Sequence, residues 1–175
     1  ILSTGVALFL EIYAEKIFPF SLQSNIIGIL FRSFIIISFC EELVKWLFTY
    51  VICWKDKNFN YVYDAIVYCV FISLGFASIE NLIAILSNSG GFALALQRGL
   101  ITVPAHAFFG IISGYYLGLA KKYEARRWNK RKRKYIILSL LIPIIVHGMF
   151  DSLLFLSSTA SLLFATALIV YLYLS

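Results

Sequence analysis

The sequence predicts an all-α membrane protein, a polytopic transmembrane bundle of about six spanning helices around a central polar cavity. Of its 175 residues, 61% are hydrophobic and 14% are charged, whereas soluble domains average roughly 25% charged residues. The mean hydropathy is +0.88, and the apolar residues form runs long enough to cross a bilayer. A soluble fold could not bury this much apolar surface, and disorder requires low hydrophobicity. Both classes are therefore excluded.

The apolar segments account for the chain as one integral-membrane domain, residues 1–175. They lie at 1–18, 24–54, 62–86, 91–119, 135–157 and 160–175. Glu11, Glu15 and Lys16 crowd the end of the first segment. The second and fourth exceed the roughly 20 residues that a spanning helix requires, so we expect them to tilt, kink or extend past the lipid. Because the sequence begins at Ile1, we also allow for a missing N-terminal segment.

The orientation follows from the basic segment 121–134, which carries nine of the fifteen Lys and Arg residues. It lies between two apolar segments, and loops of this kind face the cytoplasm. We therefore expect a multi-pass protein of the cell (cytoplasmic) membrane, with this segment inside and in contact with the lipid bilayer, and no nucleic-acid partner. Cys40, Cys53 and Cys69 lie in apolar runs without metal-ligand spacing, and we expect reduced thiols.

Ionisable residues lie where the bilayer makes them costly, and such residues mark functional sites. They are Arg32, Glu41, Glu42, Lys45, Glu80, Arg98, His106, His147 and Asp151. With a rise of about 1.5 Å per residue, the acids and imidazoles of four segments reach similar depths, with Glu80 and Asp151 further outward. One polar cavity inside the bundle is the simplest explanation.

Two short motifs place charged groups on one helix face. In EELVK, Lys45 follows Glu41 by four residues and Glu42 by three, so it can pair with either. Adjacent side chains point about 100° apart, so one glutamate can serve as base or ligand while Lys45 holds the other. The alternative is an ion-pair cluster that braces two helices. In HGMFD, His147 and Asp151 share a face and can bind one ion, or the carboxylate can orient the imidazole.

Two further segments supply candidate polar and small residues. In GFASIEN, Glu80 can act as a ligand, and Asn81 can donate to a substrate backbone or bond a neighbouring helix. In HAFFGIISGYYLG, Gly110, Gly114 and Gly118 follow His106 on its own face. This stripe can seat a substrate segment at Gly110, or it can serve helix packing.

This set of residues suits the activation of water, since no serine or cysteine lies in a nucleophile motif. One route uses a divalent metal, most simply Zn²⁺, held by imidazole and carboxylate groups while a spare glutamate takes a proton. For this route we expect Glu80, His106 and His147 as ligands, with Glu42 or Asp151 as a further one. The other route uses a glutamate base and needs no metal. Both lead to hydrolysis inside the membrane, plausibly of a peptide bond.

The motifs EELVK, GFASIEN, HAFFGIISGYYLG and HGMFD, in this order, resemble those of the PrsW family of intramembrane proteases, within the CAAX-protease/Abi superfamily. The resemblance implies a multi-pass bacterial membrane protease, with either the metal or the glutamate route open. Characterised members make the first cut in a single-pass anti-sigma factor, which releases a stress response. It also implies catalytic positions, which are Glu41, Glu42, Glu80, His106, His147 and Asp151. Lys45, Asn81 and Gly110 then bind or orient the substrate.

Three other functions are alternatives to this interpretation of the sequence. A CAAX or bacteriocin-processing peptidase is disfavoured by Lys45, because those motifs carry arginine at a different spacing. A non-catalytic scaffold, related to a gamma-secretase subunit, would suit a chain that lacks the paired glutamates. A transporter would show internal repeats, and none is evident. The sequence does not indicate an oligomeric state.

Overall fold

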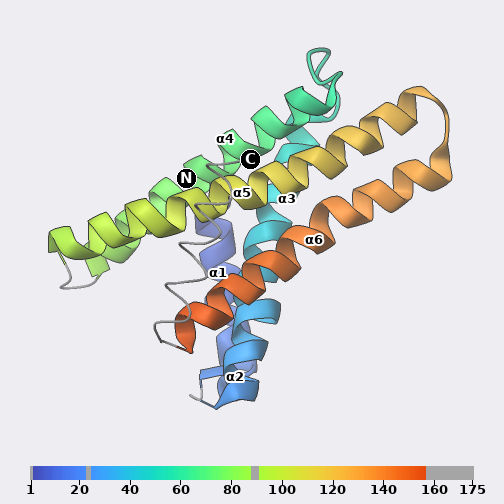
Figure 1. Ribbon diagram of the computed structural model, residues 1–175. Helices are drawn as coiled ribbons and strands as arrows, with labels where there is room; N and C mark the ends of the chain where they lie inside the picture. The colour runs from blue at the N-terminus through green and yellow to red at the C-terminus, as the bar shows by residue number, and fades with distance from the viewer. Residues whose placement is uncertain (1, 23–24, 88–90, 157–175) are drawn as a thin grey trace.

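A computed structural model describes residues 2–22, 25–87 and 91–156, and every regular element in these ranges is helical (Figure 1). The α-helices are α1 (Leu2–Ile17), α2 (Ile26–Phe31), α3 (Phe39–Cys53), α4 (Val62–Ser87), α5 (Gly91–Ala125) and α6 (Asn129–Phe155). A 3₁₀-helix (Pro19–Leu22) follows α1, and a π-helix (Arg32–Ser38) joins α2 to α3. The all-α prediction is confirmed for this part of the chain.

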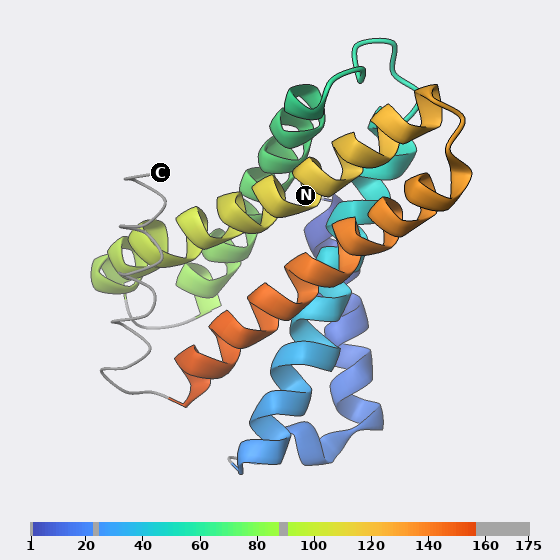
Figure 2. The ribbon, with the colours of Figure 1, turned by 45° about the vertical axis from the view of Figure 1, so that its right-hand side comes forward.

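The long helices α4 and α5 lie side by side, and α6 packs against α5 (Figure 1). The α1–α3 group crosses these helices at a steep angle, and Figure 2 shows it descending from them. Helix α3 contacts α1, α4 and α6, and α1 also contacts α4. The N-terminal part of the chain therefore packs across the other helices and brings α3 into the bundle.

Within the described residues, three helices are long and apolar enough to cross a membrane, namely α4, α5 and α6. They correspond to the third, fourth and fifth expected spans. The second expected span is one helical stretch from Ile26 to Cys53, with the π-helix in its middle. The first is the 16-residue α1. The sixth, 160–175, lies outside the described residues, so the count of six stays a prediction.

The glycine stripe of α5 packs directly on the backbone of α4. A β-carbon at Gly114 would lie 2.5 Å from Ile66 Cα, and one at Gly118 would lie 2.6 Å from Val62 Cα. One at Gly110 would lie 3.0 Å from Val70 Cα. The expectation that Gly110 contacts substrate is therefore corrected, because its open side is filled by α4. Small residues let the two backbones approach this closely.

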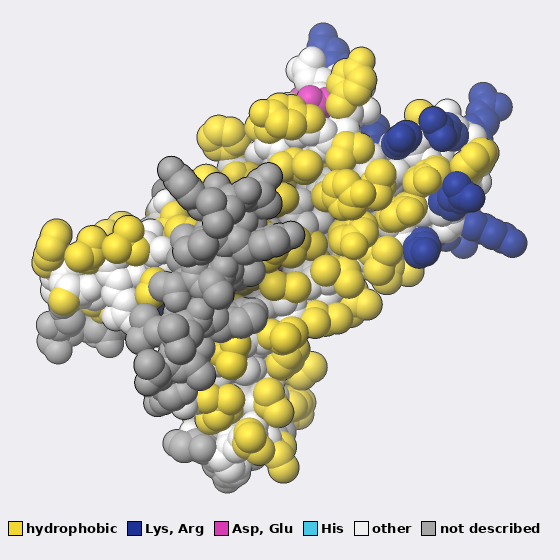
Figure 3. Space-filling view, viewed as in Figure 1, with side chains coloured by type: hydrophobic (Ala, Val, Ile, Leu, Met, Phe, Trp, Pro, Cys, Tyr) yellow, Lys and Arg dark blue, Asp and Glu magenta, His cyan; other side chains and the backbone are white. Residues whose placement is uncertain are grey.

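The basic segment is helical rather than a loop. Helix α5 continues to Ala125 and α6 begins at Asn129, so only residues 126–128 interrupt the helix. Lysine and arginine are good helix formers, and the ends of both helices can extend beyond the apolar part of the bundle. Figure 3 shows Lys and Arg side chains gathered at this end, while hydrophobic side chains cover much of the remaining visible surface.

The α3–α4 connection lies at the same end of the molecule as the α5–α6 connection (Figure 2). Lys121 Nζ joins them, because it donates a 2.6 Å hydrogen bond to the carbonyl of Trp54. Glu124 pairs with Lys121 at 3.3 Å and also with Lys132 across the α5–α6 turn. A hydrogen bond and two ion pairs of basic side chains therefore hold the connections together at this end.

The π-helix brings one aromatic ring against α6. A β-carbon at Gly148 would lie 2.5 Å from Cδ1 of Phe34, so a larger residue would force the Phe34 ring to shift. A π-helix carries an extra residue relative to α-helical register and often accompanies functional sites. Here it directly precedes the α3 segment that carries Glu41 and Glu42.

We predict that Gly114→Ala lowers the stability of the folded protein by about 1–3 kcal/mol, because the added methyl overlaps the α4 backbone. The matched control is Gly75→Ala on α4, where a β-carbon meets nothing within 4 Å. Thermal unfolding in detergent measures both. A Gly114→Ala variant as stable as Gly75→Ala would refute the close contact.

Candidate active site

Helix α3 buries three charged residues in its first two turns. Glu41 is 4% exposed, and Glu42 and Lys45 are each 3% exposed. Their spacing places Lys45 one turn beyond both glutamates. Lys45 Nζ lies 2.6 Å from Glu42 Oε1 and 3.4 Å from Glu41 Oε2. The shorter contact shows that Lys45 holds Glu42 more closely than Glu41.

Glu42 joins α3 to α6. Its Oε1 atom also lies 2.8 Å from Nδ1 of His147, so a single oxygen contacts both the ammonium and the imidazole. The other ring nitrogen, Nε2, lies 3.3 Å from Oδ2 of Asp151, one turn along α6. The Phe109 ring stacks on His147 with centroids 4.5 Å apart. Carboxylates on both sides and an aromatic face thus fix this imidazole.

His106 on α5, like His147 on α6, has a charged side chain near each of its ring nitrogens. Its Nδ1 lies 3.1 Å from Lys45 Nζ, and its Nε2 lies 3.1 Å from Oε2 of Glu80 on α4. Arg98 donates from Nη2 to Glu80 at 2.5 Å and from Nε to the Asn81 side-chain oxygen at 2.7 Å. The buried Asn81 therefore bonds the neighbouring helix, and Arg98 secures the carboxylate that faces His106.

These side chains surround a cavity of about 150 Å³, which has room for several water molecules. Its polar lining consists of Glu41, Glu80, Arg98, Thr102, His106, His147 and Asp151. Its apolar lining includes Ile37, Phe150 and Leu154. Glu42 and Lys45 are absent from this lining, so Glu41 is the member of the glutamate pair that faces the cavity.

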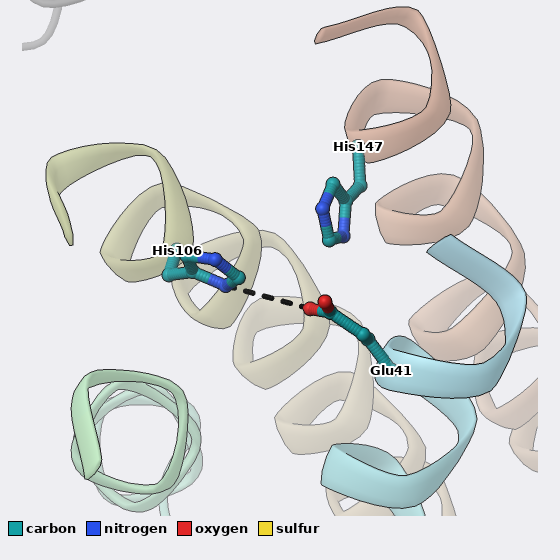
Figure 4. A group of neighbouring side chains, drawn as sticks. All are labelled: Glu41, His106 and His147. Carbon is teal, nitrogen blue, oxygen red and sulfur yellow. Dashed lines mark ion pairs between the residues drawn. The ribbon is translucent and has the colours of Figure 1, made fainter. Parts of the chain in front are cut away.

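One carboxylate and both histidines form a group able to hold a metal ion. Glu41, His106 and His147 each offer one ligand atom, and these atoms lie within 4.8 Å of one another. Figure 4 shows the three side chains converging from α3, α5 and α6, with His106 Nδ1 and Glu41 Oε2 4.0 Å apart. Two imidazoles and a carboxylate are a ligand set typical of catalytic zinc.

Two unpartnered oxygens support the fit of a cation. Glu80 Oε2 and Asp151 Oδ2 are buried and accept no hydrogen bond, although each lies beside a histidine nitrogen. Buried carboxylate oxygens without a donor are costly, and a bound cation would compensate them. The candidate metal group contains Glu41, whereas we expected Glu80 as the carboxylate ligand. Glu80 lies beside this group, 3.1 Å from His106.

Glu11 of α1 is a further carboxylate close to the site that the sequence analysis does not single out. Its Oε1 atom is buried and accepts no hydrogen bond, and the charges that act on it include those of Glu41, Glu80 and Asp151. In the sequence, Glu11 stands only among the residues that crowd the end of the first apolar segment. Its position one turn beyond the fully buried Ala7 was the signal that it faces inward.

The comparisons with known proteins point to one family. The model of the "PrsW family intramembrane metalloprotease" matches residues 1–175. A protease PrsW of Halalkalibacterium halodurans is 42% identical over 129 residues, which cover 74% of this chain and 57% of the relative. That of Clostridioides difficile is 39% identical over 128 residues, 72% of this chain and 52% of the relative.

A third relative agrees with these two. Protease PrsW of Bacillus subtilis is 37% identical over 127 residues, 73% of this chain and 56% of the relative. The chain spans little more than half the length of these curated relatives. No solved structure gives a significant match. The family model over the whole length and these identities agree, and the chain belongs to the PrsW family of intramembrane proteases.

Proposed function

We propose that the chain is the catalytic part of an intramembrane protease, which hydrolyses a peptide bond in or near the transmembrane segment of a membrane-protein substrate. The observation that carries this proposal is the buried Glu41–His106–His147 group at the edge of a polar cavity. The family supports the reaction class. Apolar helices that enclose water-sized space support a reaction that consumes water inside the bundle.

The metal of this site is proposed to be Zn²⁺, held by Glu41, His106 and His147. A divalent ion with these ligands supplies Lewis-acid activation of water and of the substrate carbonyl. The donor set supports this choice, since zinc accepts both imidazole and carboxylate ligands. Glu80 Oε2 and Asp151 Oδ2 are buried without a hydrogen-bond donor, which supports a bound cation beside them.

The protein's own residues divide the remaining work. Glu80 Oε2 is buried, accepts no hydrogen bond and borders the cavity, so it can take a proton from water there. Arg98 holds the other oxygen of Glu80. Glu42 lies 2.8 Å from Nδ1 of His147 and Asp151 lies 3.3 Å from Nε2. A carboxylate on one ring nitrogen orients a histidine that would bind a metal through the other.

The family resemblance and the charge distribution support a proposal for the substrate and for the orientation. We propose a single-pass anti-sigma factor as the substrate and the cell (cytoplasmic) membrane as the location. The basic end of α5 and α6 is placed in the cytoplasm by the positive-inside rule. Glu80 and His147 lie far along α4 and α6 from that end, so cleavage is expected in the middle or outer half of the membrane.

We predict that Glu41→Gln lowers cleavage of a tethered single-pass substrate by at least about 100-fold, because the cavity loses its ligand or base. The matched control is Glu15→Gln, which removes a carboxylate from the partly exposed pair with Arg32. Gel analysis of the cleaved substrate measures both. A Glu41→Gln variant that cleaves at the wild-type rate would contradict the assignment.

We predict that the purified full chain, prepared without chelators, contains about one zinc ion per chain. His106→Ala and His147→Ala should each lose the ion and the cleavage activity together. Cys53→Ala should keep both, because this thiol packs in a separate core cluster. Elemental analysis by mass spectrometry gives the metal content.

The same two assays separate the mechanisms. Cleavage that requires Glu41 but continues in a metal-free preparation would replace the zinc route with the glutamate-base route. A folded protein that neither binds metal nor cleaves a suitable substrate would favour the scaffold role instead.

A further inference from the structure

The ammonium of Lys45 lies among the groups proposed to hold the metal. Its Nζ atom is 2.6 Å from Glu42 Oε1, 3.1 Å from His106 Nδ1 and 3.4 Å from Glu41 Oε2. It also lies 4.8 Å from the centre of the Phe76 ring, a face that attracts cations. The side chain is 4% exposed. A cation of the protein itself therefore contacts two of the three candidate ligands.

The contact with His106 uses Nδ1, the ring nitrogen that lies 4.0 Å from Glu41 Oε2 and that a metal shared with Glu41 can reach. An ammonium has three donors and no acceptor, so Nδ1 must direct its lone pair at Lys45. The other ring nitrogen, Nε2, lies 3.1 Å from Oε2 of Glu80, an oxygen that accepts no aligned hydrogen bond. A histidine binds metal through the same kind of lone pair. Lys45 and a divalent ion therefore cannot both use Nδ1.

Charge explains why a lysine is present among metal ligands. The cluster contains four carboxylates, those of Glu41, Glu42, Glu80 and Asp151, and two permanent cations, Lys45 and Arg98. Arg98 is engaged by Glu80 at 2.5 Å. Lys45 is then the cation that compensates the glutamates of α3. Its flexible four-carbon stem allows the ammonium to leave His106 while it stays on Glu42.

We propose that Lys45 is an internal cation that holds the place of a divalent ion. It keeps Glu41 and His106 together before the ion arrives, gives up His106 Nδ1 when the ion binds, and thereby lowers the metal affinity of the site. This inference rests on the proposed function, since it requires the Glu41–His106–His147 group to be the metal site. Lys45 is a positioning residue in it and keeps Glu42 as its partner throughout.

The test is Lys45→Met, which keeps a long unbranched side chain and removes the charge. We predict that Zn²⁺ affinity, measured on the full chain in detergent by competition with a chelating dye, rises about tenfold or more. The metal-free variant should unfold at a lower temperature, because Glu42 loses its buried partner. Lys121→Met, remote from the cluster, should leave Zn²⁺ affinity unchanged. A purely structural lysine would instead lower stability without raising affinity.

A second comparison avoids the risk that Lys45→Met does not fold. Glu42→Gln with Lys45→Met removes the pair together, and it should bind Zn²⁺ about tenfold more tightly than Glu42→Gln alone. Equal or weaker binding in both comparisons would overturn the inference and leave the metal site intact. If neither wild type nor variants bind Zn²⁺, both the inference and the zinc route of the proposed function fail.

Discussion

The contact between Glu42 and Lys45 inside the helix bundle is the interaction on which the site depends. Both side chains are almost fully buried and lie 2.6 Å apart. Removing one partner of such a pair typically costs about 3–5 kcal/mol, because the other charge stays buried. Each member also reaches another helix, Glu42 to His147 on α6 and Lys45 to His106 on α5. The need to compensate these charges therefore fixes α3, α5 and α6 against one another at the level of the cavity.

Close backbone packing makes this arrangement possible. Gly114 and Gly118 let α5 lie directly on α4, which brings His106 within 3.1 Å of Glu80. Gly148 admits the Phe34 ring between the π-helix and α6, next to His147. Side chains at these positions would separate the helices, and the ligand atoms could no longer lie within 4.8 Å of one another. The small residues thus act on the site indirectly, because they set how closely the helices that carry the ligand atoms can approach.

Much of this could be predicted from the sequence, because a charge in an apolar run is costly and so must face a partner. That argument predicts the helices and one cavity where carboxylates and imidazoles of four segments meet, but it does not separate Glu41 from Glu42. It does not give the rotation of each helix. Which glutamate faces the cavity depends on a rotation of about 100°, and the π-helix before Phe39 shifts that register. For the same reason Gly110 was expected to contact substrate and instead packs on α4, and the inward face of Glu11 went unnoticed.

The central claim is that a carboxylate and two imidazoles from three helices meet at one divalent ion. Zinc K-edge X-ray absorption on the purified, zinc-loaded full chain tests it most directly. The account predicts a first shell of nitrogen and oxygen atoms at about 2.0–2.2 Å, with outer-shell scattering from two imidazole rings. A spectrum without imidazole scattering, or one with sulfur at about 2.3 Å, would contradict it.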